Sequence, residues 1–245
     1  MKELQKLLSS VRRAAEHYDM IAPGDRIAVG LSGGKDSAAL LYTLAKLMEF
    51  YPAPFTLCGI SVDLGFPGKD GLFEPVSELC ASLGVEYRVV ETQIAEIVFD
   101  ARREKNPCSL CAKLRRGALN GEAAAMGIHK VALGHHLDDA AETFMMSLLF
   151  EGRIGCFSPV TVYEDRNLTV IRPLVYTRES EVRSLVRAAG LPVIESPCPE
   201  NGSTERAEMK RLLHSLEREH RGLYERLLGA MERKNIDGWE TSRGG

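Results

Sequence analysis

The sequence predicts an α/β fold in which a five-stranded parallel sheet carries helices on both faces. Two observations lead to this prediction. Short apolar runs rich in β-branched residues alternate with longer stretches in which apolar residues recur at helical spacing. The longer stretches also separate the short runs, as crossover helices do in parallel βα units. A length of 245 residues is enough to bury a large core without disulfide bonds.

The expected strands are short and are bounded by turn residues or by the start of a helical period. They are residues 26–31, 55–62, 86–91, 130–134 and 169–174. The expected helices of the sheet domain have apolar residues on one face. They are residues 37–50, 72–83, 110–126, 138–150 and 179–189.

The two ends of the chain are expected to add helices to the sheet domain. Residues 1–20 form an amphipathic pattern that ends at a Pro-Gly-Asp turn. Residues 205–234 carry dense mixed charge around regularly spaced leucines, which predicts two short helices joined near residues 220–222. The tail from Trp239 has no packing pattern and is expected to fray. The predicted units are therefore an N-terminal lead-in (1–25), a central domain (26–199) and a C-terminal helical appendage (200–245).

Composition excludes several classes of protein. Hydrophobic residues make up 44% and charged residues 27%, which is typical of a globular domain and not of a disordered or collagenous chain. No apolar run reaches the roughly 18 to 20 residues that cross a bilayer, and the N-terminus lacks the apolar region of a signal peptide. We therefore expect a cytoplasmic protein with no membrane partner.

The net charge of -3 gives no global indication of nucleic-acid binding, so any such surface must be local. One candidate is the basic segment 102–116, in which six basic residues accompany one acid. The six are Arg102, Arg103, Lys105, Lys113, Arg115 and Arg116.

A glycine-containing loop joins the first expected strand to the first helix of the sheet domain. Its sequence is Ser32-Gly-Gly-Lys-Asp-Ser37. Amides at a helix N-terminus, glycines that let the backbone approach closely and the charge of Lys35 together favour an anion site over a simple tight turn. The spacing excludes a Walker A loop, because Gly30 and Gly34 are separated by three residues instead of four and Asp36 stands where Ser or Thr would bind magnesium.

The loop resembles the SGGxDS pyrophosphate loop of N-type ATP pyrophosphatases. The resemblance implies a PP-loop, Rossmann-like domain that splits ATP to AMP and pyrophosphate, adenylates its target and uses Mg²⁺. It also implies that the nucleotide contacts Ser32, Gly33, Gly34, Lys35, Asp36 and Ser37.

Two further groups lie where expected strands end, at the edge of the sheet that binds ligands in open α/β folds. Asp63 follows the second strand and could instead only cap its own loop. Gly134-His-His-Leu-Asp-Asp139 follows the fourth strand. Its acids could be simple first-turn residues, and with the histidines they could form a metal site. The block resembles the GHHxDDxxET element of the same family, so we assign Gly134, His135, Asp138 and Asp139 to ATP and magnesium, without deciding which aspartate binds the metal.

Three of the six cysteines form a candidate metal site. Cys108 and Cys111 open a helix in the basic segment, where helix dipoles and positive charge are expected to lower thiol pKa values. Cys198 lies between two prolines on an expected rigid loop. A redox pair or incidental cysteines are alternatives for Cys108 and Cys111. Three thiolates without a fourth ligand fit a [4Fe-4S] cluster with one open iron better than a structural zinc. Cys58, Cys80 and Cys156 are interpreted as buried or incidental thiols.

The cysteine segment 108–117, together with Cys198 and Ile171-Arg-Pro-Leu174, is similar to the tRNA 2-thiocytidine synthetases, the TtcA family. The similarity extends from about residue 12 to about residue 231. It implies a cluster held by Cys108, Cys111 and Cys198, a tRNA substrate, and a sulfur donor such as a cysteine desulfurase or inorganic sulfide. It also places Arg115 beside the active site, although charged helix residues often only face water. Catalytic roles are assigned to Lys35, Asp36, Asp63, Asp139 and Arg115.

The leading hypothesis is ATP-dependent thiolation at C2 of a cytidine in the tRNA anticodon loop. Thiolation of a uridine, lysidine synthesis and a non-catalytic ATP-binding or redox-sensing module are the alternatives. Lysidine synthesis does not require the three cysteines, and the sequence does not decide whether the protein is a homodimer.

Overall fold

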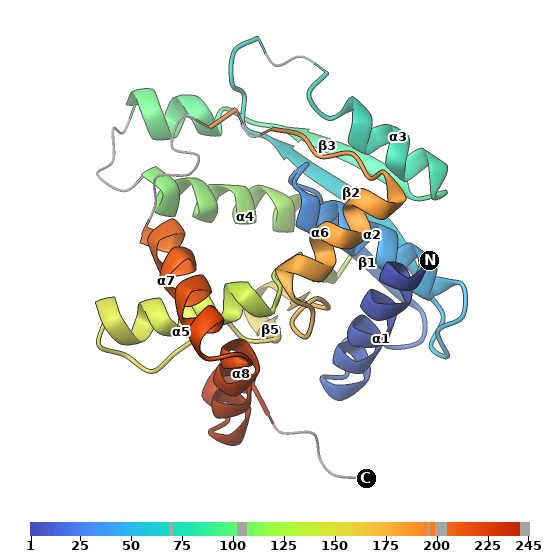
Figure 1. Ribbon diagram of the computed structural model, residues 1–245. Helices are drawn as coiled ribbons and strands as arrows, with labels where there is room; N and C mark the ends of the chain where they lie inside the picture. Colours follow the sequence, from blue (N-terminus) through green and yellow to red (C-terminus); the bar gives the residue numbers. More distant parts are fainter. Residues whose placement is uncertain (69–70, 102–106, 196, 199–204, 241–245) are drawn as a thin grey trace.

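The computed structural model describes residues 1–68, 71–101, 107–195, 197–198 and 205–240. Within them, one sheet has the strand order β3-β2-β1-β4-β6-β5 (Figure 1). The strands are β1 (Asp25–Gly30), β2 (Phe55–Asp63), β3 (Glu86–Glu91), β4 (Lys130–Ala132), β5 (Val160–Tyr163) and β6 (Leu168–Ile171).

Helices surround this sheet and follow the expected positions to within a few residues. They are α1 (Lys2–His17), α2 (Lys35–Met48), α3 (Glu74–Ser82), α4 (Pro107–Ala125), α5 (Leu137–Phe150), α6 (Glu179–Ala189), α7 (Glu205–Glu219) and α8 (Leu223–Arg233). Three short elements are not expected from the sequence: the π-helix η1 (Glu96–Ala101) and the 3-10 turns η2 (Glu164–Arg166) and η3 (Ile236–Gly238).

The five expected strands form a parallel array, and a sixth strand extends it. β5 pairs antiparallel with β6 at the edge of the sheet. β5 is not expected from the sequence because it has only four residues, with no helical period beside it. The turn η2 and the left-handed Asn167, at φ 45°, reverse the chain into β6. The run Val-Thr-Val-Tyr is the available signal, since β-branched and aromatic residues favour strands.

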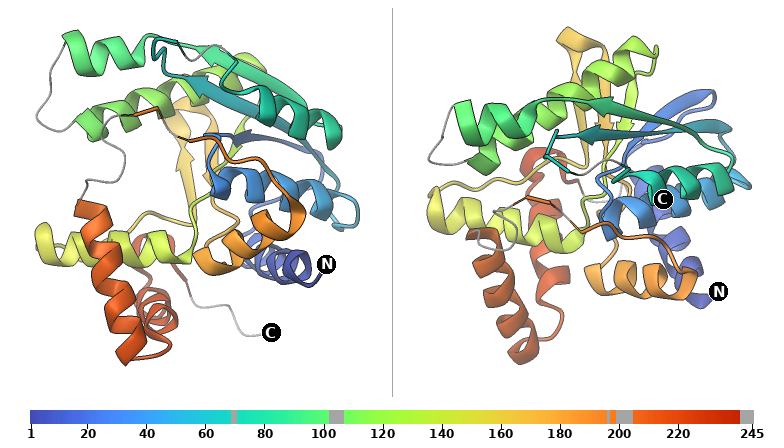
Figure 2. Two further views of the ribbon diagram at one scale, coloured as in Figure 1. Left: turned by 45° about the horizontal axis from the view of Figure 1, so that its top comes forward. Right: turned by 90° about the horizontal axis from the view of Figure 1, so that it is seen from above.

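Helices cover both faces of the sheet, as predicted. Along β1, Ile27 and Val29 belong to the larger core, whereas Ala28 belongs to a smaller one, because successive strand residues point to opposite faces. Leu119 and Ala123 of α4 complete the smaller core. The other helices lie on the opposite side, with α2 against the sheet and α1 and α6 beyond it (Figure 2).

The C-terminal helices share the larger core instead of standing clear of it. Met209 and Leu213 of α7 and Tyr224 of α8 are buried in that core. The prediction of a frayed tail is wrong at Trp239, which is fully buried and donates its Nε1–H to the carbonyl of Phe157 at 2.8 Å. A single residue after a helix has no periodicity to reveal such packing. The division into three units stays a prediction.

The strand order positions the site. β2 follows β1 on one side, and β4 pairs with β1 on the other, with Ile27 opposite Lys130 and Val29 opposite Ala132. The order therefore reverses at β1, and the loops that leave β1 and β4 diverge around a crevice at the carboxyl edge of the sheet. Those loops carry the two sequence motifs.

Candidate nucleotide and cluster site

A pocket of about 440 Å³ lies at this edge of the sheet. Apolar side chains from β2 and the segment after it form part of its wall, among them Ile60, Val62, Leu64 and Phe66. The predicted site residues that line it are Ser32, Asp36, Ser37, Asp63, Arg115, Arg116, Gly134, His135 and Asp139. The fold therefore brings residues from four separate segments around one cavity that combines apolar walls with converging polar groups.

The phosphate loop has a fixed backbone. Gly33 adopts φ +81°, which favours glycine, and a Cβ there would lie 3.0 Å from the side chain of Ile194. Ile194 also donates its backbone N–H to the carbonyl of Gly33 at 2.8 Å. Gly34 is the N-cap of α2, so the amides of the first turn face the loop. The segment that leads to Cys198 is thus hydrogen-bonded to the phosphate loop.

Lys35 and Asp36 lie in the first turn of α2 and form an ion pair. The Lys35 ammonium donates to Asp36 Oδ2 at 2.9 Å and contacts Glu179 Oε1 at 3.0 Å. The second carboxylate oxygen of Asp36 is buried without a hydrogen-bond partner and lies 3.6 Å from His136 Nε2. An unsatisfied carboxylate oxygen at a pocket wall is suited to a ligand that brings a cation or a donor.

The two aspartates at the start of α5 have different surroundings. Asp139 lines the pocket and accepts the backbone N–H of His136 at 2.9 Å, which completes a capping box. Asp138 is buried, and its oxygens accept hydrogen bonds from Arg178 and from the backbone N–H of Glu179. The carboxylate of Asp138 is therefore occupied by protein contacts, whereas that of Asp139 is open to the pocket.

His135 and Asp63 complete the polar side of the pocket. Burial lowers the pKa of His135 to about 4, and the charge of Arg172 acts in the same direction, so this imidazole is neutral at physiological pH. Its Nδ1 is buried without a partner. Asp63 caps its own loop, as the alternative interpretation holds, by accepting the Gly65 N–H at 2.9 Å, and it also lines the pocket.

None of the three predicted cluster ligands forms a disulfide bond. Cys108 is exposed in the first turn of α4, Cys111 is buried one turn later, and Cys198 is half-buried. Cys108 and Cys198 both act electrostatically on Cys111. The expectation of a lowered pKa is wrong for Cys111, where burial raises the pKa and outweighs the opposing effect of Arg115.

A family model described as a PP-loop domain matches residues 4–216. The chain belongs to the PP-loop family. It is 41% identical over 225 residues to a tRNA-cytidine(32) 2-sulfurtransferase of Pelobacter propionicus, covering 89% of this chain and 83% of that relative. It is 36% identical over 230 residues to the tRNA-cytidine(32) 2-sulfurtransferase of Geobacter sulfurreducens, covering 93% and 89% of the two chains.

A solved PP-loop structure has the same fold. It is the U34-tRNA thiolase NcsA from Methanococcus maripaludis with its [4Fe-4S] cluster, at a TM-score of 0.75 and 28% identity. The similarity covers 92% of this chain and 77% of that one.

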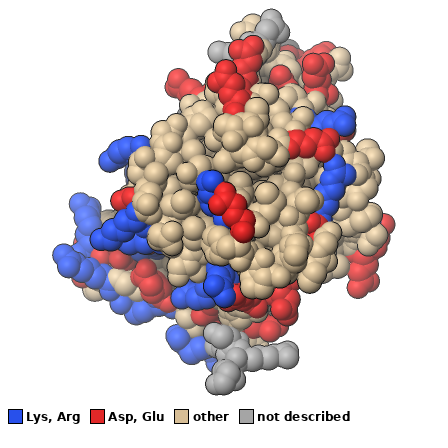
Figure 3. Space-filling model, turned by 90° about the vertical axis from the view of Figure 1, so that its right-hand side faces the viewer, with Lys and Arg blue, Asp and Glu red and all other residues tan. Residues whose placement is uncertain are grey.

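The basic residues of this PP-loop chain fall into three groups. Arg115 and Arg116 are exposed on α4 and line the pocket. Lys113 is exposed but is not part of the pocket lining. Arg102, Arg103 and Lys105 lie outside the described residues. On the face shown in Figure 3, Lys and Arg are interspersed with Asp and Glu around a largely uncharged centre, which fits the small net charge.

No sequence pattern indicates the residues that contact the predicted PP-loop residues Lys35 and Asp138. Lys35 contacts the carboxylate of Glu179, which Lys210 contacts as well. Asp138 contacts Arg178. Glu179 follows the last expected strand by only a few residues, but no spacing rule links it to the phosphate loop. Among the described helices, none is both long and apolar enough to cross a membrane.

Proposed function

We propose that this chain is an ATP-dependent tRNA thiolase that replaces the C2 oxygen of an anticodon-loop cytidine with sulfur. The observation that carries the proposal is the meeting of the phosphate loop and the three-cysteine group. Ile194, four residues before Cys198, is hydrogen-bonded to Gly33, and Arg115, one turn after Cys111, lines the nucleotide pocket. The names of the relatives agree with this chemistry and point to cytidine 32 as the position.

ATP phosphates would bind at the start of α2. The amides after Gly34 and the Lys35 ammonium offer positive charge there. The base oxygen attacks the α-phosphorus, pyrophosphate leaves, and the oxygen later departs with AMP when sulfur takes its place. Arg115 and Arg116 lie where they can stabilise the charge that develops during both displacements.

Magnesium would be held by carboxylates that face the pocket. Asp36, Asp63 and Asp139 all line it, and oxygen ligands are those that Mg²⁺ prefers. We assign the metal to Asp139 and not to Asp138, because Arg178 already occupies both oxygens of Asp138.

The donor set fits an iron-sulfur cluster. Cys108, Cys111 and Cys198 form no disulfide bond, and Cys108 and Cys198 both act electrostatically on Cys111. Cys108, Cys111 and Cys198 would hold the cluster, which would supply a place where sulfur can be held for transfer. The burial that raises the pKa of Cys111 favours the neutral thiol in the metal-free protein, so cluster binding would release a proton from it.

Product analysis tests the proposal. The protein is reconstituted with iron and sulfide without oxygen, incubated with unmodified tRNA, ATP, magnesium and sulfide, and the nucleosides are identified by mass spectrometry. We expect 2-thiocytidine, with pyrophosphate released in equal amount. Cys198→Ser should lose bound iron and product together, whereas the matched control Cys156→Ser, outside the cluster group, should keep both.

The other outcomes separate the alternatives. Thiouridine as the product would support sulfur transfer to tRNA but would refute cytidine as the target base. Lysidine, or the absence of any thiolated nucleoside from the iron-loaded protein, would refute sulfur transfer. ATP binding without pyrophosphate release in the presence of tRNA would support a non-catalytic module.

A further inference from the structure

Glu179, the first residue of α6, is a buried carboxylate surrounded by cations. Its relative exposure is 3%. It accepts hydrogen bonds from Lys35 of α2 at 3.0 Å, Arg183 of its own helix at 2.9 Å and Lys210 of α7 at 2.7 Å. These contacts hold the pKa of Glu179 well below its usual value despite burial. One anion therefore gathers three positive charges from three helices.

Two of these cations are held close together. Lys35 and Lys210 both donate to the same oxygen, Oε1 of Glu179, at 3.0 Å and 2.8 Å. Their ammonium nitrogens are therefore separated by no more than the sum of these two distances. Two like charges at such a separation repel each other, and the shared carboxylate is what keeps them there.

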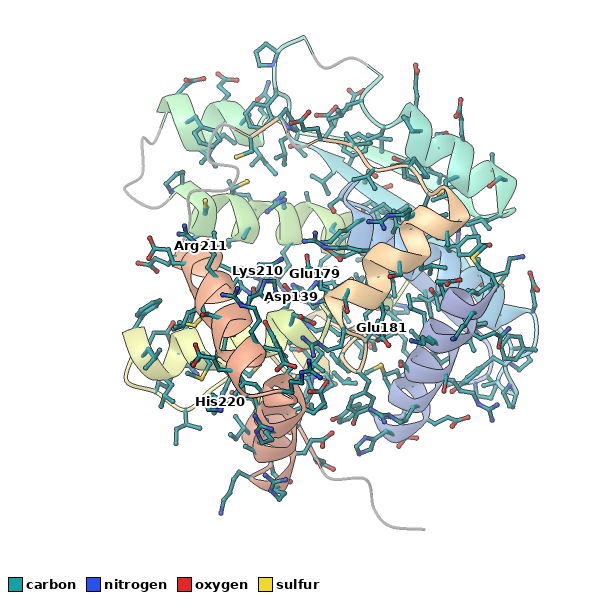
Figure 4. The ribbon with its side chains drawn as sticks, viewed as in Figure 1. Asp139, Glu179, Glu181, Lys210, Arg211 and His220 are labelled. Carbon is teal, nitrogen blue, oxygen red and sulfur yellow. The ribbon has the colours of Figure 1, made fainter. Side chains whose placement is uncertain are left out.

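The position of α7 is fixed by contacts with α5. One turn before Lys210, Arg206 donates to Glu142 at 3.4 Å and to Thr143 at 3.1 Å, both on α5. Residues four apart lie on one face of a helix, so Arg206 and Lys210 face the same side of α7. Figure 4 shows Lys210 of α7, Glu179 of α6 and Asp139 of α5 lying close together. This face of α7 thus contacts α5 through Arg206 and reaches, through Lys210, the carboxylate of Glu179 that Lys35 also contacts.

The local charge favours an anion as the missing partner. Lys35, Lys210 and Arg183 carry three positive charges against the two carboxylates of Glu179 and Asp36. A metal ion does not fit the same place. Asp138, Glu179 and His214 bring possible ligand atoms within 4.8 Å of one another, but both carboxylates are already paired with arginine or lysine.

We propose that Lys210 is a second polyphosphate-binding cation, acting beside Lys35, and that Glu179 is the positioning residue that holds both ammonium groups at the phosphate loop. The ligand class is the β- and γ-phosphates of a nucleoside triphosphate, or the pyrophosphate formed from them. This inference rests on the proposed function for the identity of the nucleotide. It adds α7, outside the predicted motifs, to the binding machinery.

The test measures binding of ATP, pyrophosphate and adenosine to the cluster-loaded protein by calorimetry. Lys210→Ala should weaken ATP and pyrophosphate binding by about 10- to 100-fold, the range expected when a charge-assisted hydrogen bond is removed. Adenosine binding should stay unchanged, because adenosine has no phosphate. Lys210→Arg should restore most of the ATP affinity, since it keeps the charge.

Arg211→Ala is the matched control. Arg211 is the exposed next residue of α7, about 100° around the helix, so its removal makes the same change in net charge. If Lys210→Ala binds ATP as tightly as Arg211→Ala does, the proposal is overturned. It is also overturned if Lys210→Ala weakens the binding of adenosine as much as the binding of ATP. A wild-type protein that binds ATP but makes no thiolated nucleoside would refute the proposed function alone.

Glu179→Gln tests the positioning role separately. It keeps the shape of the side chain and removes the charge that holds the two lysines. We expect weakened ATP binding with unchanged adenosine binding, and a combined Glu179→Gln and Lys210→Ala variant that binds ATP little worse than Glu179→Gln alone. Additive effects would contradict the shared role. Should Glu179→Gln fail to fold, the Lys210 series still decides the ligand contact.

Discussion

Glu142 has an environment opposite to that of Glu179, although both carboxylates face α7. It is buried on α5, its Oε1 has no hydrogen-bond partner, and its ion pair with Arg206 measures 3.4 Å. Burial and the charge of Asp139 raise its pKa to about 7, from an ordinary value of 4.5. At neutral pH this residue is therefore divided between its two protonation states.

A pH dependence of stability follows from Glu142. Between pH 4.5 and about 7 the folded protein holds this proton more tightly than the unfolded chain does, so the free energy of unfolding falls as pH rises through that window. Glu142→Gln should remove this part of the fall, as measured by urea unfolding of the nucleotide-free protein in EDTA at several pH values. The exposed control Glu219→Gln should follow the wild type. Parallel curves for wild type and Glu142→Gln would show that Glu142 has an ordinary pKa.

Local chemistry decides which residues could be predicted. Ser32 to Ser37 could be predicted because the loop, its glycines and the following helix start are adjacent in sequence. The pocket collects Asp63, His135 and Asp139 because parallel strands end at one edge. Glu179 and Lys210 could not be predicted, because their contact depends on how α7 packs against α6. The pairing of Asp138 depends in the same way on where α6 begins, since Arg178 immediately precedes that helix.

At the scale of elements, the C-terminal helices are held from both ends. Arg206 ties the start of α7 to α5, and Trp239, just after η3, fills the core between Tyr18 and Phe157. The helices themselves were predictable from leucine spacing, whereas this anchoring was not, because Trp239 and Phe157 are distant in sequence. β5 escapes prediction for a related reason: its partner β6, and not its own length, stabilises it.

Trp239→Ala should therefore destabilise the whole fold. Removing a fully buried Trp typically costs about 3 to 5 kcal/mol, and here the hydrogen bond to Phe157 disappears as well. Trp239 is the only tryptophan of the chain, so unfolding in urea should be followed by circular dichroism instead of fluorescence. The free energy of unfolding of Trp239→Phe should lie between those of the wild type and Trp239→Ala, because phenylalanine restores most of the buried volume but has no N–H donor. If Trp239→Ala lowered the free energy of unfolding by less than about 1 kcal/mol, the tail would be as weakly held as its sequence suggests.

For the whole molecule, a net charge of -3 means that tRNA must be bound by a local basic surface against an unfavourable overall charge. Arg115 and Arg116 are the described basic residues of this segment that line the pocket. The sequence could locate this segment but not its outline, because which side chains of α4 reach the pocket depends on how that helix packs on the sheet. The predicted contribution of Arg102, Arg103 and Lys105 stays a prediction.

The salt dependence of tRNA binding measures that surface. Replacing Arg115 and Arg116 together by Ala should reduce the slope of log affinity against log salt by about 0.7 to 0.9 for each phosphate that the variant no longer neutralises. Arg218→Ala, an exposed change on α7, should leave the slope unchanged. An unaltered slope in the Arg115 and Arg116 variant would place the RNA backbone elsewhere on the protein.

The hydrogen bond between Ile194 and Gly33 also affects when the phosphate loop is completed during synthesis of the chain. It joins the phosphate loop to a segment some 160 residues later, and Lys35 meets its partner Glu179 at a comparable separation. Contacts this distant in sequence form late, because a long intervening loop has to close first. A chain emerging from the ribosome contains both motif loops once residue 139 has been synthesised, but it then lacks Ile194, the partner of Gly33, and Glu179, the second partner of Lys35. The contacts that fix the phosphate loop are therefore complete only after the segment that contains Ile194 has been synthesised.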